Sequence, residues 1–255
     1  MVVTLVETSE VDAGRIVEIS KRAFDTGFDN VGPNSDRPLG YDSEAFYIKS
    51  LHFLDCYNIL LGEEVVGGVM AKVGGRHGVL DRIFIDPDHQ RRGIGSAAMG
   101  LAMERYPEVT FWTLGVPEGD TRTKQFFEKL GFRQVGWSYG DSAYRECWYE
   151  RRIGESDVFS PIAALRDGMS NVIIEGKVTE KSFPRQVRSK RTGGSLTVAN
   201  AAIEDASGRI VMVLWDKQFE LVKVGGNIRV EDGYVNSYNG VTQLNVGYGR
   251  LIILI

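Results

Sequence analysis

The chain has 255 residues, of which 43% are apolar and 25% charged, so one or two ordinary globular domains are expected. No apolar run approaches the ~20 residues that span a bilayer, and the acidic start lacks the pattern of a secretion signal. Two cysteines, Cys56 and Cys147, exclude a disulfide framework, and three scattered histidines show no zinc-type spacing. We therefore expect a cytoplasmic protein without a membrane segment or a metal site.

The net charge of −4 is unevenly distributed along the chain. It consists of −6 for residues 1–156 and +2 for residues 157–255. Half of the basic residues in the second part lie in one segment: Lys177, Lys181, Arg185, Arg188, Lys190 and Arg191. The chain as a whole is therefore not built to bind polyanions, although this segment has the charge to do so.

The first 150 residues alternate strand and helix signals. A strand at 2–6 precedes a helix that Thr8 or Ser9 would cap and that runs to about Ala23. The later signals are a helix at 41–53, a hairpin at 56–73, a strand at 78–87, a helix from about Ile94, a strand at 109–116, a helix at 120–130 and two strands within 132–150. This alternation predicts a layered α/β domain over residues 1–152.

The pattern changes after residue 152. Residues 153–160 have no periodicity and end in Ser-Pro, so they predict a linker. Residues 161–255 are dominated by strand signals, with one short helical segment at 216–222. The five strands predicted there are NVIIEGKVTEK, SLTVANAAIE, GRIVMVLWD, NIRVEDGYVN and TQLNVGYGRLIILI, and their spacing predicts a small closed or part-closed barrel.

The segment DPDHQRRGIGSAAM carries the clearest chemical signal of the first domain. Its glycines, Gly93 and Gly95, fall where a strand ends and a helix begins. The first amides of a helix lack internal partners, and glycine leaves them accessible, so such a turn is suited to a phosphate group. A surface loop that merely contains two glycines is the alternative interpretation of the pattern alone. The turn is neither a dinucleotide-binding fingerprint nor a P-loop, because no third glycine or Gly-Lys-Ser/Thr follows in register.

Two motifs in order resemble the GCN5-related N-acetyltransferase (GNAT) family. The first is Gln90-x-x-Gly93-x-Gly95, and the second is KQFFEKLGF at 124–132. The resemblance implies an α/β fold of α+β type with a mixed, splayed sheet, and acetyl-CoA as cofactor. The residues implied to bind CoA are Ile83, Phe84 and Ile85 for the pantetheine arm; Gln90, Arg91, Arg92, Gly93, Ile94, Gly95 and Ser96 around the pyrophosphate; and Phe126, Phe127 and Lys129 on the far side.

The acid and base of the reaction are less well marked. Many members of the family carry a tyrosine that protonates the thiolate where this chain has Phe127. Tyr139 or Tyr144, on the strands that follow, would have to replace that hydroxyl. Asp81 is the candidate base, because its position before the loop matches a carboxylate that the family often uses. A solvated or salt-bridged aspartate is an equally good interpretation of that residue.

Residues 161–255 resemble the OB-fold of archaeal, replication-protein-A-like single-stranded-DNA-binding proteins. The shared segments are PIAALRDGMSNVIIEGKV, EDASGRIVMVLWDK and GYVNSYNGVTQLNVG. The resemblance implies that Trp215, Tyr234 and Tyr238 stack on bases. The basic residues of the first inter-strand loop would contact phosphates, and they are Lys181, Arg185, Arg188, Lys190 and Arg191. A solvated loop and an apolar protein-docking face are the alternatives.

The sequence therefore predicts an acetyl-CoA-dependent N-acetyltransferase fused to a barrel that binds single-stranded DNA or RNA. The acceptor would be an amine on a protein lysine or N-terminus, or one associated with nucleic acid. Two alternatives stay open: a non-catalytic CoA-binding scaffold, favoured by Phe127, and a barrel that mediates dimerisation or protein docking. The pattern does not decide the oligomeric state.

Overall fold

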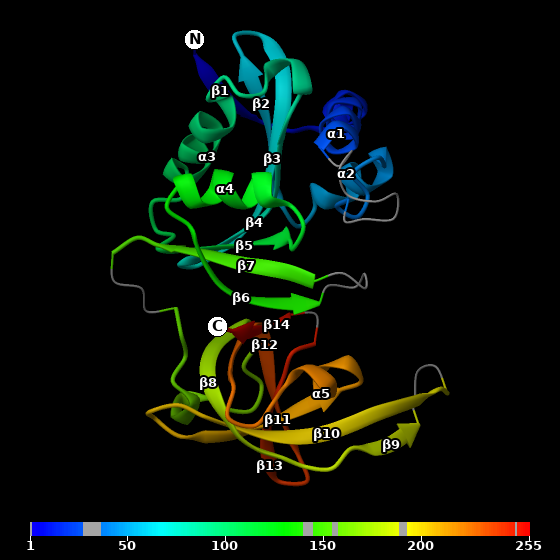
Figure 1. Ribbon diagram of the computed structural model, residues 1–255, viewed down its shortest axis with the longest axis vertical. Helices are drawn as coiled ribbons and strands as arrows, with labels where there is room; N and C mark the ends of the chain where they lie inside the picture. Colours follow the sequence, from blue (N-terminus) through cyan, green and yellow to red (C-terminus); the bar gives the residue numbers. More distant parts are fainter. Residues whose placement is uncertain (1, 28–36, 140–144, 155–157, 189–192, 248) are drawn as a thin grey trace. The chain divides into compact units, whose positions relative to one another are not determined.

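The computed structural model describes residues 2–27, 37–139, 145–154, 158–188, 193–247 and 249–255. The chain divides into two compact units (Figure 1). The first unit comprises Met1–Gln134 and Tyr139–Ser156, and the second comprises Val135–Ser138 and Asp157–Ile255. Strand β6 (Arg133–Tyr139) crosses this division.

The first unit is built on a mixed sheet in the order β1-β2-β3-β4-β5-β7. All neighbours are antiparallel except β4 and β5, which are parallel. The bounds are Val3–Glu7 for β1, Asp55–Leu61 for β2, Glu64–Gly74 for β3, His77–Ile85 for β4, Phe111–Pro117 for β5 and Arg145–Arg152 for β7. The α/β class predicted from the alternating pattern is confirmed.

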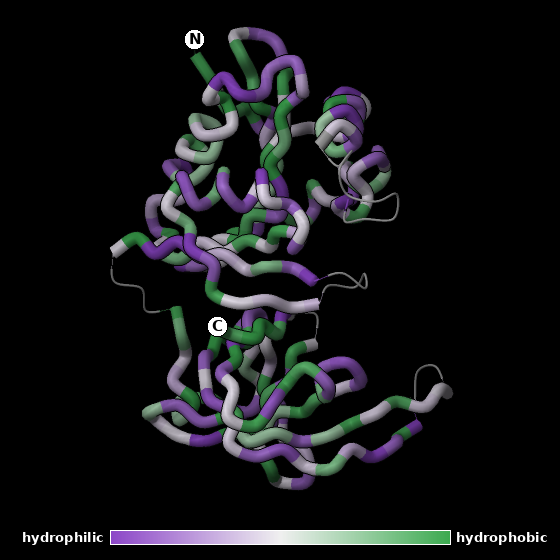
Figure 2. Tube along the Cα trace, in the orientation of Figure 1, coloured by the Kyte–Doolittle hydropathy of each residue, from purple (hydrophilic) through white to green (hydrophobic). Residues whose placement is uncertain are grey.

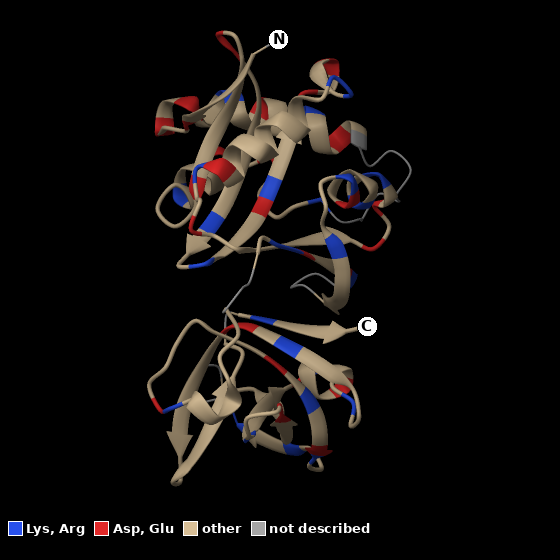
Figure 3. Ribbon diagram, turned by 90° about the vertical axis from the view of Figure 1, so that its left-hand side faces the viewer, with Lys and Arg blue, Asp and Glu red and all other residues tan. Residues whose placement is uncertain are grey.

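Helices cover both faces of this sheet. They are α1 (Ala13–Gly27) and α2 (Glu44–Ser50) on one face and α3 (Ile94–Glu104) and α4 (Thr121–Lys129) on the other (Figure 1). Phe84 and Ile85 are neighbours on β4 and point to opposite faces by strand alternation: Phe84 packs in the cluster of α1 and α2, whereas Ile85 packs, together with Leu80, in the cluster of α3 and α4. Charged residues of this unit lie mainly on helices and loops (Figure 3).

The helix ends follow the capping signals in the sequence. Ser9 precedes a single 3-10 turn (Glu10–Asp12), and the Asp12 carboxylate accepts hydrogen bonds from the Ser9 backbone N–H (2.8 Å) and Oγ (2.6 Å). These bonds lower the pKa of Asp12. Helix α1 then extends one turn beyond the predicted end near Ala23. Asp120 caps α4 by accepting from the Thr123 N–H at 2.9 Å.

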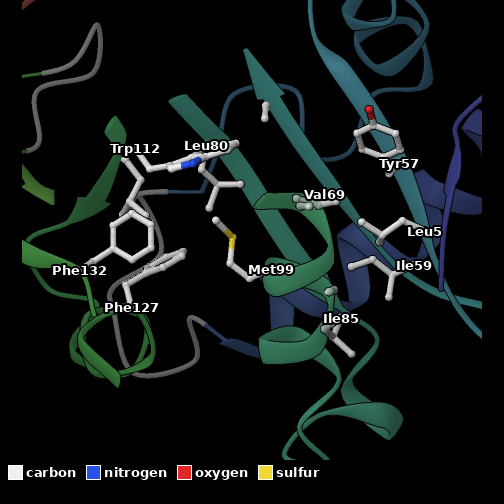
Figure 4. Packing of buried hydrophobic residues seen from close by; sticks show 14 of the residues in the cluster. Leu5, Tyr57, Ile59, Val69, Leu80, Ile85, Met99, Trp112, Phe127 and Phe132 are labelled. Carbon is white, nitrogen blue, oxygen red and sulfur yellow. The ribbon is translucent and has the colours of Figure 1, made fainter. Parts of the chain in front are cut away.

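The apolar cluster between the sheet and α3 and α4 forms the larger core of this unit. Figure 4 shows Met99 of α3 pointing at Leu80 of β4, with Phe127 and Phe132 side by side. The rings of Phe127 and Phe132 meet edge-on with centroids 5.6 Å apart. Because Phe127 is only 4% exposed, its ring serves this core as well as the site described below.

The second unit contains a closed five-stranded barrel. The barrel strands pair in the order β8-β10-β11-β13-β12 and back to β8, and only β11 and β13 are parallel. Strand β9 pairs with β10, β14 pairs with β12, and a short helix, α5 (Lys217–Leu221), follows β11. The bounds are Val172–Lys181 for β8, Arg185–Arg188 for β9, Ser195–Glu204 for β10, Arg209–Trp215 for β11, Asn227–Tyr238 for β12, Val241–Asn245 for β13 and Arg250–Leu254 for β14.

The barrel confirms the fold predicted for the second half, with one correction. The segment TQLNVGYGRLIILI is two strands, β13 and β14, rather than one. Gly247 has φ +59°, and a Cβ on Gly249 would collide with the backbone of Glu231 and Asp232, so the chain turns there. Hydrophilic and hydrophobic residues interleave along the barrel strands, as period-2 alternation requires (Figure 2).

Candidate functional site

A β-bulge in β4 opens the sheet of the first unit. Strands β3 and β4 pair Met70 with Arg82 and Ala71 with Leu80, so Asp81 is the extra residue. The parallel register of β4 with β5 ends at Leu80 and Leu114. Beyond that point β4 continues only against β3 and β5 only against β7. The ends of β4 and β5 therefore diverge, and Ile83–Ile85 face the opening.

A cavity of about 450 Å³ lies at this opening. It is lined by the end of α1, β4, the turn before α3, the start of α3, and α4 with its cap residue. Twelve of the thirteen residues predicted to bind CoA line it: Ile83, Phe84, Ile85, Gln90, Arg91, Gly93, Ile94, Gly95, Ser96, Phe126, Phe127 and Lys129. Arg92 is exposed and does not line it.

The start of α3 presents backbone amides to this cavity. Gly93 is the N-cap residue, in the left-handed region with φ +79°, and Arg91 has φ +58°. The first bond of the helical ladder runs from the Ala97 N–H to the Gly93 carbonyl at 3.0 Å. The amides of Ile94, Gly95 and Ser96 precede that bond and lie where intrahelical partners are lacking.

The two glycines of this turn have different physical roles. Gly93 is required by its backbone conformation, since nothing lies within 4 Å of the place where a Cβ would be. A Cβ on Gly95 would make ordinary contact with the Phe126 ring at 3.4 Å and with Ile85 at 3.8 Å. Gly95 is therefore not required by a strained backbone, and a Cβ there would fit against Phe126 and Ile85.

Gln90 connects the two sides of the cavity. Its side-chain N–H donates to the Ile85 carbonyl at 2.8 Å, at the end of β4. Its side-chain oxygen accepts from Arg122 Nη2 at 2.5 Å, in the first turn of α4. The glutamine predicted as a cofactor contact thus also fixes the turn that carries the amides.

Several lining residues were not identified from the sequence: Ala23, Phe24, His89, Asp120, Arg122, Thr123 and Gln125. The start of α4 was predicted from its cap, so its first-turn residues were available as candidates, and Arg122 is the basic one. Phe24 gave no such signal, because only packing brings the end of α1 beside Phe84, with ring centroids 5.8 Å apart.

A second arginine ties α1 to the loop before α3. Arg22 contacts the buried carboxylate of Asp86 at 2.8 Å and that of Asp88 at 2.7 Å. Asp86 also accepts a hydrogen bond from the Asp88 N–H at 3.1 Å. The loop is therefore held from α1 on one side and from α4 on the other.

The predicted acid and base residues do not line the cavity. Asp81 lies on the bulge, with a half-exposed carboxylate 2.7 Å from Arg82 Nε. Tyr139 ends β6 and is 44% exposed, whereas Tyr144 lies outside the described residues. Among described residues, the lining contains no tyrosine, and its titratable groups include His89, Asp120 and Lys129.

One outer face of the barrel gathers the three predicted stacking residues. Met212 and Leu214 point into the barrel core, so Val211, Val213 and Trp215 of β11 point outward. On β12, Val235 points inward, so Tyr234 and Tyr238 point outward.

Strand register places these residues on one surface. Tyr234 pairs with Asn245 and Tyr238 with Val241 on β13. Gln243 of β13 pairs in turn with Val211 of β11. The side chains of Trp215, Tyr234 and Tyr238 are 40%, 40% and 59% exposed. We call this surface the aromatic face, made of Val211, Val213, Trp215, Tyr234, Asn236, Tyr238, Val241, Gln243 and Asn245.

The basic residues predicted beside this face differ in their surroundings. The Lys181 ammonium donates to the carbonyls of Phe219 (3.0 Å) and Val222 (2.8 Å), and burial followed by the charge of Lys223 lowers its pKa. Lys181 is therefore engaged by the end of α5. Arg185 and Arg188 are exposed on β9, and the Arg188 Nε donates to the Gly193 carbonyl. Lys190 and Arg191 lie outside the described residues.

Within the described ranges, no group of three or more His, Cys, Asp or Glu residues is arranged to hold a metal ion. Among the same residues, no helix is both long and apolar enough to cross a bilayer.

Comparison with known proteins assigns each unit to a family. Residues 18–132 match the acetyltransferase (GNAT) family, and residues 167–252 match the Ssb-like OB-fold of single-stranded DNA binding proteins. The second unit is 30% identical over 86 residues to the single-stranded DNA binding protein Ssb of Saccharolobus solfataricus. That match covers 34% of this chain and 57% of the length of Ssb.

Solved structures agree with the fold of the first unit. The PaiA N-acetyltransferase of Thermoplasma acidophilum, crystallised with coenzyme A, aligns with a TM-score of 0.51 and 14% identity over 60% of this chain and 100% of its own. An acetyltransferase of Thermus thermophilus aligns with a TM-score of 0.50 and 22% identity, over 60% of this chain and 98% of its own. The chain thus consists of a GNAT-family acetyltransferase domain followed by an Ssb-like OB-fold domain.

Proposed function

We propose that the first unit is an acetyl-CoA-dependent N-acetyltransferase that acts on an amine. The observation that carries this proposal is the cavity at the divergence of β4 and β5, with the start of α3 in its wall. The N-terminus of an eleven-residue helix offers free amides and a partial positive charge to an anion. The relative from Thermoplasma acidophilum, which contains coenzyme A, supports the same assignment.

The residues around the cavity fit the chemistry of CoA. Arg91, Arg122 and Lys129 bring positive charge to the lining, as a pyrophosphate requires. The side chains of Ile83 and Phe126 give the same cavity an apolar wall suited to the pantetheine arm. The amides of α3 would hold the pyrophosphate, and the open edge of β4 would offer backbone groups to the pantetheine amides.

Acetyl transfer needs a deprotonated amine, a polarised carbonyl and a proton for the departing sulfur. Bound acetyl-CoA supplies the activated acetyl group. Asp81, on the bulge beside the opening, would accept the amine proton directly or through water. Phe127 has no proton to donate, so Tyr139 or Tyr144 would return one to the thiolate. Holding both reactants in place supplies much of the rate even without a strong acid.

The first test is ligand binding by the full chain. CoA at ~100 times its dissociation constant should stabilise the first unit by ~2.7 kcal/mol, which appears as a rise in its melting temperature. An unchanged melting temperature with both acetyl-CoA and CoA contradicts the proposal. Release of free CoA with a panel of amines then separates an enzyme from a non-catalytic CoA-binding scaffold, the alternative that the buried Phe127 favours.

We also propose that the aromatic face of the second unit binds single-stranded nucleic acid. The carrying observation is that Trp215, Tyr234 and Tyr238 share one outer face and are each at least 40% exposed. Base stacking on such residues contributes ~1–3 kcal/mol per base and tolerates any sequence. The match to Ssb over this unit supports it. Quenching of tryptophan fluorescence by oligonucleotides, absent in Trp215→Phe and weaker at high salt, tests it.

Together, the two units would deliver the transferase to an acceptor held on nucleic acid. The acceptor would be a protein lysine or N-terminus bound to the same strand, or an amine of the nucleic acid. Single-stranded oligonucleotide should then raise the rate with a DNA-bound protein acceptor but not with a free peptide. If oligonucleotide changes the rate with neither acceptor, the barrel does not deliver the transferase to nucleic acid, and docking or dimerisation becomes its better interpretation.

A further inference from the structure

A bulge beside the aromatic face carries Phe183, the most exposed large apolar side chain among the described residues of the second unit. Along β10, Ala201 pairs with Lys181 of β8 and Val198 pairs with Arg185 of β9. Between these two pairs, β10 advances by three residues (201 to 198), whereas the segment that joins β8 to β9 advances by four (181 to 185). The extra residue lies at Phe183 or Pro184, and a bulge of this kind turns a side chain away from the regular pleat.

The bulge is fixed on both sides rather than loose. Ser182 donates its N–H to the Asn200 carbonyl at 2.8 Å, and its Oγ accepts the Asn200 N–H at 3.0 Å. Pro184 cannot donate to a ladder, and it restricts the backbone of Phe183 to extended conformations. Phe183 is therefore held outward, with 95% of its surface exposed.

The position of the bulge relates Phe183 to the stacking residues. Val198 pairs on one side with Arg185 and on the other with Trp215, so these three residues share one cross-strand row. Asn200, which anchors the bulge through Ser182, pairs with Val213 in the next row of the aromatic face. Phe183 thus projects from the segment that borders this face along β10.

The chemistry of the surroundings favours a polynucleotide as the occupant. The nine residues of the aromatic face include no carboxylate, and amide side chains alternate with the aromatic ones. Arg185, two residues from Phe183, is exposed in the same row as Trp215. A ring with its face in solvent next to an unburied arginine is the combination that binds a base and its phosphate.

We propose that Phe183 is a fourth base-stacking residue, which extends the single-stranded nucleic-acid site from Trp215 onto the bulge between β8 and β9. The inference rests on the proposed nucleic-acid binding of the aromatic face. Phe183 does not belong to the apolar cluster of the barrel core, so truncating it should leave the fold intact.

The experiment measures binding of fluorescein-labelled oligo(dT) to the full chain by anisotropy. Phe183→Ala should weaken binding about 5- to 140-fold, the change that corresponds to the loss of one stacked base. Phe183→Leu should lose about as much, because it keeps the apolar surface but not the ring, whereas Phe183→Trp should bind at least as tightly as the unaltered chain. Val224→Ala, at a 58% exposed apolar position of the same unit, is the matched control and should change nothing.

The length dependence provides a second measurement. In a series of oligo(dT) of increasing length, the affinity of Phe183→Ala should stop rising at a shorter length than that of the unaltered chain. Unchanged affinity in Phe183→Ala, with Trp215→Ala weakened, overturns this inference and leaves the aromatic face intact as the site. Full binding by Phe183→Leu assigns Phe183 to apolar docking and also overturns it. No binding by the unaltered chain overturns the proposed barrel function together with this inference.

Discussion

Gly93 gives the sharpest test of the turn that begins α3. Its φ of +79° lies in a region that costs a residue with a Cβ roughly 1–2 kcal/mol. No atom lies within 4 Å of the added Cβ, so backbone strain is the whole penalty. Gly93→Ala should therefore lower the free energy of unfolding of the first unit by ~1 kcal/mol, which corresponds to ~2–4 °C in melting temperature for a unit of this size. Relief of that strain would move the amides of Ile94 and Gly95, so CoA affinity should fall as well.

The same helix offers a matched control of opposite sign. Gly100 lies in its exposed interior, has no positive φ, and has nothing within 4 Å of its Cβ position. Gly100→Ala should stabilise the unit by ~0.5–1 kcal/mol and leave CoA affinity unchanged. Gly93→Asn should recover part of the loss, because asparagine adopts the left-handed region more readily than alanine. Calorimetry and titration with CoA measure both quantities. Equal effects of Gly93→Ala and Gly100→Ala would refute the reasoning.

Three further outcomes are expected. Arg122→Ala should weaken CoA binding by about tenfold in calorimetric titration, because it removes one charge-assisted contact to the phosphates and the hydrogen bond to Gln90. An unchanged dissociation constant would show that Arg122 does not contact CoA. The hydrogen bonds from Ser9 hold the pKa of Asp12 below its usual value, so Ser9→Ala should lower the free energy of unfolding by ~0.5–1 kcal/mol at neutral pH. In urea unfolding, the difference in stability between Ser9→Ala and the unaltered chain should disappear as the pH falls through that lowered pKa, because Asp12 is then protonated in both. In the barrel, Arg185→Ala should lower the slope of log affinity against log salt concentration by about one counterion. Trp215→Ala should lower the affinity for the oligonucleotide without changing this slope. The reverse result would assign the phosphate contact to Trp215 and the stacking contact to Arg185, and would contradict the proposal.

The sequence was sufficient for features that depend on neighbouring residues. The order of strands and helices in the first unit follows from local periodicity, and the caps at Ser9 and Asp120 follow from residue types that satisfy free amides. The position of the turn before α3 was predictable for the same reason, since two glycines between a strand and a helix leave the helix amides open. The barrel was also predictable, except that glycine conformations divide its last predicted strand into β13 and β14.

Only tertiary structure decided which distant residues meet. Register between β3 and β4 makes Asp81 the bulged residue, and it is packing that brings Arg122 of α4 to Gln90. The same limit applies to Lys181. Its place in a basic run indicated a phosphate contact, but in the structure its ammonium donates hydrogen bonds to the carbonyls of Phe219 and Val222.

The barrel shows the physical reason most clearly. Period-2 alternation told which residues of β11 share a face, but not that β13 would place Tyr234 on the same surface as Trp215. Nor did it reveal the bulge that exposes Phe183, since a bulge is a difference in count between two paired segments. Local sequence sets the conformation of each strand, whereas cross-strand register, fixed by burial of a common core, sets which side chains become neighbours.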